Sequence, residues 1–118
     1  MEFEVIFYKD ECGNSPIDRF LEDLGRTNPV LLRQTQIGIG KLRQRHNHRF
    51  PLTKAIGDDL YELRVGGKDT VRVLWFFMRD ARVVLVEAFV KKTSDIPEIN
   101  RKRALQRRAS FLARHRNF

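Results

Sequence analysis

Residues 60–90 read LYELRVGGKDTVRVLWFFMRDARVVLVEAFV, and this part of the chain contains three segments typical of β-strands. The segments cover residues 60–65, 70–77 and 82–90 and are rich in β-branched and aromatic side chains, which favour strands. Short links at residues 66–69 and 78–81 separate them. The sequence therefore predicts three antiparallel strands joined by two hairpins.

Side chains alternate between the two faces of a sheet, so each segment can be sorted by parity. One set is apolar or nearly so and predicts the face that packs on the core: Tyr61, Leu63, Val65, Val71, Val73, Trp75, Phe77, Val84, Val86, Ala88 and Val90. The other set mixes charged and apolar residues: Leu60, Glu62, Arg64, Thr70, Arg72, Leu74, Phe76, Val83, Leu85, Glu87 and Phe89. An antiparallel sheet can leave one face open to solvent, and we expect this second face to be open. Such a face can carry a site, or only ion pairs such as Arg72–Glu87.

The segments before residue 60 predict one more strand and two helices. Residues 2–8 begin with the alternation of a strand. Ser15 and Asn28 each precede a proline, as helix N-caps do, and predict helices over residues 16–24 and 29–44. Gly25 is expected to end the first helix. The second helix is expected to bury Val30, Leu31, Ile37 and Leu42, and its Gly38 and Gly40 to allow close approach of the first helix.

The end of the chain predicts a basic helix. Asp95 and Glu98 have the spacing of a capping box and would open a helix running to about residue 115. The order β-α-α-β-β-β-α predicts the α+β class: an antiparallel four-stranded sheet, with the two N-terminal helices on one face and a C-terminal basic helix. A chain of 118 residues suits a single domain over residues 1–118.

Composition and charge indicate where the protein acts and which class of partner it binds. No apolar run approaches the ~20 residues of a membrane span, the N-terminus has no leader pattern, and Cys12 is the only cysteine, so we expect a cytoplasmic protein without a membrane partner. The net charge is +8, and residues 91–118 hold nine basic residues against two acidic ones. This concentration favours a nucleic-acid partner over a merely solvated basic face. The expected RNA contacts are Lys54, Arg101, Lys102, Arg107 and Arg108.

The charged face of the sheet predicts a phosphate site. Arg64 and Arg72 lie on adjacent strands, and Lys91-Lys92 leaves the last strand at the edge of the same face. These four cations are expected to converge on one phosphate group. No metal or cofactor is expected, because the carboxylates are scattered and the histidine pair His46 and His48 has no third ligand. Both histidines are expected to be exposed in a basic loop, where they could instead contact RNA or act as acid and base.

Several motifs in order resemble the RelE/ParE toxin superfamily, and within it the phage-derived killer proteins grouped with HigB. They are FPLTK (50–54), LYELRV (60–65), RVLWFF (72–77), EAFVKKT (87–93), Pro97-Glu98 and Ala104. The resemblance implies cleavage of mRNA on the translating ribosome. It also implies inhibition by an antitoxin encoded beside the toxin, here a helix-turn-helix protein like HigA.

The resemblance also implies roles for individual residues. Arg72 matches the most recurrent arginine, which binds the transition-state phosphate, and Arg64 matches a basic position on the preceding strand. Lys91 and Lys92 match a basic pair after the last strand. Two departures leave the acid and base open: no tyrosine follows Tyr61, and Glu87 replaces a polar residue, often histidine.

The chemistry required is attack of the RNA 2′-hydroxyl on the neighbouring phosphate. Arg72 suits stabilisation of the developing charge, since arginine stays protonated and binds in a bidentate manner. Lys91 or Lys92 could act as acid or base, and Glu87 or Glu62 as base. Alternative functions are a ParE-like inhibitor of DNA gyrase, or a phage interaction or nucleic-acid-binding protein without catalysis.

Overall fold

The computed structural model describes residues 2–67, 70–92 and 95–115. In chain order the elements are β1 (Glu4–Phe7), α1 (Pro16–Thr27), α2 (Pro29–Lys41), a 3-10 turn (Arg45–Asn47), β2 (Thr53–Gly57), β3 (Leu60–Val65), β4 (Thr70–Met78), β5 (Arg82–Lys91) and α3 (Glu98–Arg114). The predicted α+β class is confirmed. No helix among the described residues is both long and apolar enough to cross a membrane.

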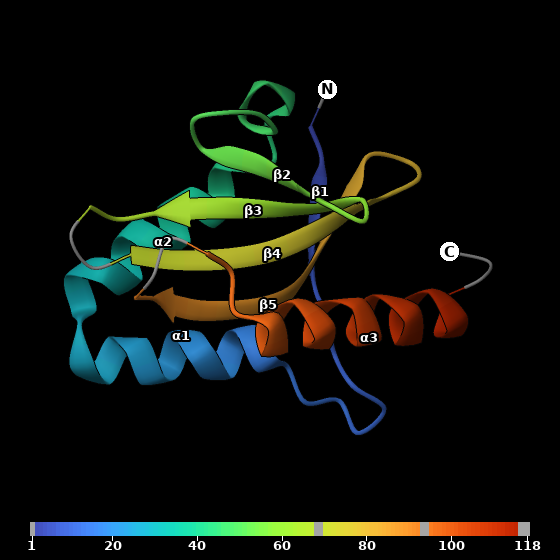
Figure 1. Cartoon of the computed structure of the whole chain (residues 1–118), viewed down its shortest axis with the longest axis horizontal. Helices are drawn as coiled ribbons and strands as arrows, with labels where there is room; N and C mark the ends of the chain where they lie inside the picture. Colours follow the sequence, from blue (N-terminus) through green and yellow to red (C-terminus); the bar gives the residue numbers. More distant parts are fainter. Residues whose placement is uncertain (1, 68–69, 93–94, 116–118) are drawn as a thin grey trace.

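The sheet is mixed and has five strands within the described part of the chain, in the order β1-β5-β4-β3-β2 (Figure 1). The pairs β3–β4 and β4–β5 are antiparallel, as predicted. The prediction of four antiparallel strands is wrong in two respects: β1 pairs with β5 in parallel, and β2 adds a fifth strand. The partners β1 and β5 are far apart in sequence, so no hairpin turn dictates their direction.

Strand β2 forms a tight hairpin with β3 that was not predicted from the sequence. Asp58 and Asp59 lie between the paired residues Gly57 and Leu60, and both have positive φ, +57° and +58°. Two central residues with positive φ match the right-handed twist of a hairpin, and aspartate tolerates this conformation better than most residues. The turn places Lys54 directly opposite Glu62 on β3.

The two N-terminal helices begin where their caps predict. Asp18 N donates to Ser15 Oγ at 3.3 Å, and Leu31 N donates to Asn28 Oδ1 at 3.1 Å. Gly25 does not end α1, which continues to Thr27 because Asn28 caps both helices. Helix α2 ends at Lys41, three residues before the predicted end.

The predicted burial of Leu31 and Leu42 is confirmed, but the predicted burial of Val30 and Ile37 is wrong. Val30 is 70% exposed and Ile37 is 51% exposed, whereas Leu31, Ile39 and Leu42 are buried as part of the first core. Gly38 faces the sheet and not α1: a Cβ there would lie 3.0 Å from Val65 Cγ2. The missing side chain therefore lets α2 approach β3 closely.

The sheet lies between two cores, one on each face. The first packs α1 and α2 against side chains such as Leu63, Val73 and Trp75. The second packs α3 against the opposite face through Leu74, Phe76, Ala104 and Phe111, among others. Figure 1 shows α3 lying in front of the sheet along β5. The expectation that this face is open to solvent is therefore wrong, because α3 covers much of it.

A β-bulge in β5 changes the parity halfway along the strand. Trp75 pairs with Leu85 but its neighbour Leu74 pairs with Glu87, so Val86 is an extra residue. Before the bulge, Val83 and Leu85 face the first core, and Val84 and Val86 face α3, opposite to the prediction. The predicted sides of Ala88 and Phe89, beyond the bulge, are correct.

Helix α3 begins without the predicted capping box. Its N-cap is Pro97, which has no side-chain capping hydrogen bond, and Glu98 is its first residue. Asp95 therefore lies two residues ahead of the cap and cannot serve as one. The predicted end of the helix near residue 115 is confirmed.

Candidate functional site: a carboxylate among three cations

Strand register brings the predicted basic residues together on the face covered in part by α3. Arg64 on β3 lies directly opposite Arg72 on β4, which in turn pairs with Phe89 on β5. Glu62 lies two residues before Arg64 on the same face of β3. Lys91 ends β5, opposite Thr70.

The cations meet at the carboxylate of Glu62. Lys91 Nζ lies 3.5 Å from Glu62 Oε2, Arg72 Nε lies 3.7 Å from Oε1, and Arg64 Nε lies 4.0 Å from Oε1. We call these four residues the Glu62 cluster. Of the predicted site residues, Arg64, Arg72 and Lys91 therefore converge as expected, but around a carboxylate that the prediction held only as a lesser candidate base.

The four side chains of the Glu62 cluster differ in their solvent exposure. The side chains of Glu62, Arg72 and Lys91 are 2%, 9% and 11% exposed, whereas that of Arg64 is 36% exposed. Arg64 therefore forms the solvent side of the cluster. Arg72 Nη1 donates to its own neighbour's carbonyl, Val71 O, at 3.0 Å.

The polar atoms at the centre are incompletely satisfied. Glu62 Oε2 and Arg72 Nε are buried and have no hydrogen-bond partner among the described residues, although both take part in ion pairs. Buried polar atoms without hydrogen bonds are rare in proteins and call for an explanation. Both atoms therefore retain the capacity to hydrogen-bond a ligand.

The charge of the cluster is unbalanced, since three cations surround one anion. Burial lowers the pKa of the Arg72 guanidinium, Arg64 lowers it further, and Glu62 acts in the opposite direction. Cations held close together away from water repel one another, and an anionic ligand relieves this repulsion. The arrangement therefore suits an anion such as a phosphodiester.

A cavity of about 420 Å³ opens beside Glu62 and Lys91. Its other lining residues come from β2, from α3 and from the segment before it: Lys54, Ala55, Ile56, Asp95, Ile96 and Arg101. Lys54 is exposed and directly opposite Glu62, so it adds a positive charge at the entrance. No group of three or more His, Cys, Asp or Glu within residues 2–67, 70–92 and 95–115 is arranged to hold a metal ion.

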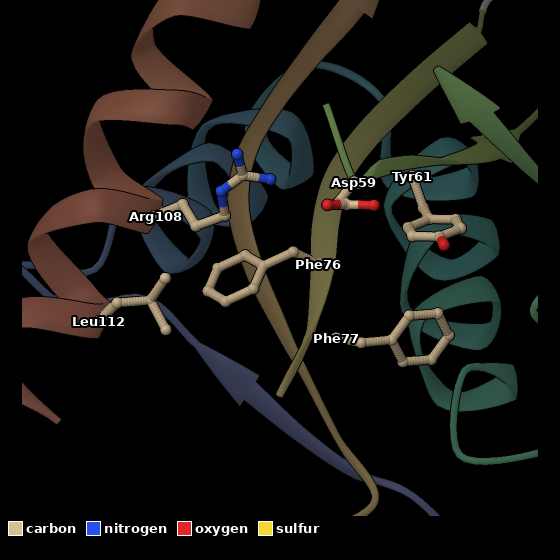
Figure 2. Close-up of a pocket in the computed structure, with 6 residues that line it drawn as sticks. All are labelled: Asp59, Tyr61, Phe76, Phe77, Arg108 and Leu112. Carbon is tan, nitrogen blue, oxygen red and sulfur yellow. The ribbon is translucent and has the colours of Figure 1, made fainter. Parts of the chain in front are cut away.

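A second cavity, of about 440 Å³, is lined chiefly by aromatic and other apolar side chains (Figure 2). Its lining residues are Asp59, Tyr61, Phe76, Phe77, Arg108 and Leu112. In Figure 2, Arg108 and Leu112 reach into it from α3, on the other side of Phe76 from Tyr61. This cavity contains no residue of the Glu62 cluster and only one cation, so it is the weaker candidate for a phosphate site.

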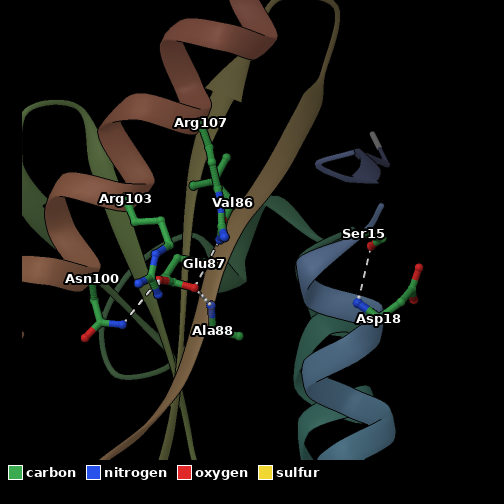
Figure 3. A network of polar contacts seen from close by, with 8 residues as sticks. All are labelled: Ser15, Asp18, Val86, Glu87, Ala88, Asn100, Arg103 and Arg107. Atoms are coloured by element: carbon green, nitrogen blue, oxygen red, sulfur yellow. Dashed lines mark hydrogen bonds and ion pairs between the residues drawn. The ribbon is translucent and has the colours of Figure 1, made fainter. Parts of the chain in front are cut away.

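Glu87 lies outside the Glu62 cluster and holds α3 to the sheet (Figure 3). Its Oε2 accepts hydrogen bonds from Asn100 Nδ2 at 3.2 Å and Arg103 Nη1 at 3.0 Å. Its Oε1 accepts from Arg107 Nη1 at 3.2 Å and from Ala88 N at 3.0 Å. Glu87 is 4% exposed, and both of its carboxylate oxygens accept hydrogen bonds from structural partners. The geometry therefore favours Glu62 over Glu87 as the candidate base.

The arginines of α3 bind the protein's own backbone and carboxylates. Arg107 Nη1 also donates to Val86 O at 2.7 Å, the carbonyl of the bulge residue. Arg101 donates to Ile56 O and Asp58, and Arg108 donates to Asp58 O. Of the predicted RNA contacts, these three therefore have internal partners, whereas Lys54 and Lys102 are exposed.

Two further predicted residues lie apart from the cluster. Lys92 is exposed beyond the end of β5 and is not among the cations paired with Glu62. His48, expected to be exposed, is buried, and its ring contacts Phe3, Trp75 and Phe77. His46 is exposed, as predicted.

The sequence model of one family, the phage-derived proteins like Gp49 (DUF891), matches residues 33–109. The match covers well over half of the chain and includes every residue of the Glu62 cluster. The chain belongs to the Gp49-like family. This family is associated with toxin–antitoxin systems and is related to RelE-like toxins. No curated protein matches the chain.

The central position of Glu62 in the site of this Gp49-like protein was not predicted from its sequence. Glu62 shares the parity of Arg64 and Arg72, and this was the available signal. The sequence also allowed Arg72 to pair with Glu87, but Glu87 is opposite Leu74 and bound to α3. Side-chain reach and the docking of α3 decide between these pairings, and neither is a local property of the sequence.

Proposed function

We propose that this Gp49-like protein is a toxin of the RelE/HigB type that cleaves messenger RNA on the ribosome, with the Glu62 cluster as its active site. The single observation that carries the proposal is the gathering of three cations around one buried carboxylate beside an open cavity. A base, an acid and fixed positive charge are what RNA cleavage by the 2′-hydroxyl requires. The family's relation to RelE-like toxins supports the same reading.

The proposed reaction proceeds by attack within the RNA. Glu62 accepts the proton of the 2′-hydroxyl while the 2′-oxygen bonds to phosphorus. The bond from phosphorus to the 5′-oxygen breaks, and Lys91 donates a proton to that oxygen. The products are a 2′,3′-cyclic phosphate and a 5′-hydroxyl. Arg64 and Arg72 stabilise the negative charge that develops on the phosphate oxygens, since fixed donors act most strongly on developing charge.

We propose that the partner is a small antitoxin with a helix-turn-helix domain, like HigA, encoded beside the toxin gene. A toxin that degrades messages must be held inactive in its own host cell. Growth arrest on expression of the chain alone, relieved by co-expression of the neighbouring reading frame, is the expected result. The substrate would be mRNA on the ribosome, without a membrane, metal or cofactor.

The test of the proposed chemistry uses purified protein, translating ribosomes and a defined message. Wild type is expected to cut the message and leave cyclic phosphate ends. Glu62→Gln is expected to reduce cleavage by about 10²- to 10⁴-fold, the usual contribution of an acid or base. Arg72→Ala is expected to reduce it by about 10²- to 10³-fold, by loss of charge stabilisation.

The matched control is Glu87→Gln, the same substitution at a buried carboxylate outside the cluster. It removes the negative charge that binds Arg103 and Arg107 of α3, so it should lower thermal stability. Cleavage by the folded protein should stay within a few-fold of wild type. An intact message at every codon would refute the nuclease proposal. If the protein then inhibits DNA supercoiling by gyrase, the ParE-like alternative is correct.

A further inference from the structure

Phe50 is an exposed aromatic side chain next to the Glu62 cluster. Six large apolar residues of the described chain are exposed, and Phe50 is the single aromatic among them, at 67%. The Arg64 guanidinium carbon lies 5.4 Å from the centre of the Phe50 ring, in a cation–π arrangement. One face of the ring thus meets a cluster residue while most of the residue's surface remains in solvent.

The turn that carries Phe50 is fixed to the sheet. Thr53 N donates to Arg49 O at 3.0 Å, which closes the turn around Phe50. Arg64 N donates to Leu52 O at 2.9 Å, which ties the same segment to β3. Thr53 is itself 1% exposed at the start of β2. Phe50 is therefore presented beside Arg64 by backbone contacts, although its side chain is not buried.

The charges around Phe50 favour a nucleic acid over an apolar protein surface. Arg49, Arg64 and Lys54 are basic and exposed or half-exposed, and the acidic Glu62 nearby is buried. An exposed aromatic ring among cations is the arrangement by which proteins bind single-stranded nucleic acid, with bases stacked on the ring and phosphates on the cations. Pro51 is an exposed apolar neighbour of Phe50, but the three basic side chains give this surface a positive charge that attracts phosphates.

Resting on the proposed function, we propose that Phe50 is the stacking platform for an unpaired base flanking the scissile phosphate. Arg64 then links the two contacts, since it meets both the Phe50 ring and Glu62. Stacking accepts any base, because every base has a π-face, so Phe50 contributes affinity with little dependence on sequence. The ligand class is single-stranded RNA.

The test measures binding separately from cleavage. A fluorescent oligoribonucleotide with 2′-O-methyl groups has no attacking hydroxyl and stays intact. Its anisotropy gives the dissociation constant for wild type, Phe50→Leu and Phe50→Trp. Loss of one stacked base costs about fivefold or more in affinity, so Phe50→Leu should bind at least about fivefold more weakly. Phe50→Trp should bind as well as wild type, with quenching of the new tryptophan fluorescence.

Val30→Ala serves as the control, since Val30 is equally exposed but lies on α2. Equal affinity of Phe50→Leu and wild type would overturn the inference while leaving the Glu62 chemistry intact. Absence of binding by wild type would also overturn the inference. The message-cleavage assay tests the proposed function independently of this result. Unchanged RNA affinity with lost antitoxin binding would assign Phe50 to a protein interface.

Discussion

His48 lies inside an aromatic cluster although its imidazole can take up a proton. Its Nε2 contacts Leu42 O, and because a carbonyl only accepts, Nε2 carries the hydrogen. Its Nδ1 is buried and has no hydrogen-bond partner among the described residues. A second proton on Nδ1 would create an unpaired buried charge. Burial accordingly lowers the pKa of His48, Arg45 and His46 lower it further, and the contact with Leu42 opposes this.

The lowered pKa of His48 predicts a loss of stability in mild acid. Below the ordinary pKa of 6.5, the unfolded chain binds a proton that the folded protein resists. The free energy of unfolding must then decrease as the pH falls, since the unfolded state binds more protons. Urea unfolding at pH 7.5, 6.5 and 5.5 measures this, with His48→Phe as the comparison. The variant should show a flatter pH dependence, and parallel curves for the two proteins would contradict the assignment.

Sequence patterns predicted which charged residues share a face better than they predicted which residues touch. The parity of Glu62, Arg64 and Arg72 follows from strand periodicity and is confirmed. The burial of His48 could not be predicted, because the basic residues around it indicate an exposed loop. Its burial depends on Phe3, Trp75 and Phe77, which come from distant parts of the chain.

The elements show the same division between local and distant causes. Caps at Ser15 and Asn28 are local signals, and both helices begin where these residues predict. The partner and direction of β1 depend on β5, about 80 residues away, and have no local signal. Val86 shows most clearly what a local pattern cannot predict. This one extra residue reverses the parity of the first half of β5, where residues on both faces are apolar.

Helix α2 contains two glycines whose surroundings predict opposite effects of a methyl group. Alanine stabilises a helix by up to about 1 kcal/mol relative to glycine. A Cβ at Gly40 would meet nothing within 4 Å, so Gly40→Ala should raise the free energy of unfolding by about 0.5–1 kcal/mol. A Cβ at Gly38 would lie 3.0 Å from buried Val65, so overpacking should outweigh the gain and Gly38→Ala should be destabilised by about 1 kcal/mol.

Chemical unfolding of the two alanine variants beside wild type checks both signs. The two substitutions have the same chemistry and lie two residues apart, so each controls for the other. Equal stabilisation by both would mean that β3 yields to the added methyl group. The close packing of α2 on Val65 would then not constrain the sequence at Gly38.

The molecule as a whole uses its positive charge in two ways. Arginines of α3 hold the helix to the sheet and the β2–β3 turn: Arg101, Arg103, Arg107 and Arg108. Other cations lie in the Glu62 cluster or are exposed near its cavity, as Lys54 is. The four arginines of α3 therefore have partners within the protein, and the basic character of this helix does not by itself make it a ligand-binding surface.

The salt dependence of RNA binding should separate these two groups of cations. Each phosphate contact releases counterions, and for single strands the logarithm of the affinity falls with the logarithm of salt by about 0.7 per contact. Lys54→Gln should therefore reduce this slope by about 0.7.

Arg107→Gln should leave the slope unchanged and lower stability by about 1–2 kcal/mol, because its partners are Val86 O and Glu87. Anisotropy titrations over about 50–200 mM salt measure the slope for both variants. An equal loss of slope in the two would mean that α3 releases its arginines to bind RNA, and the anchoring role assigned to them would then fail.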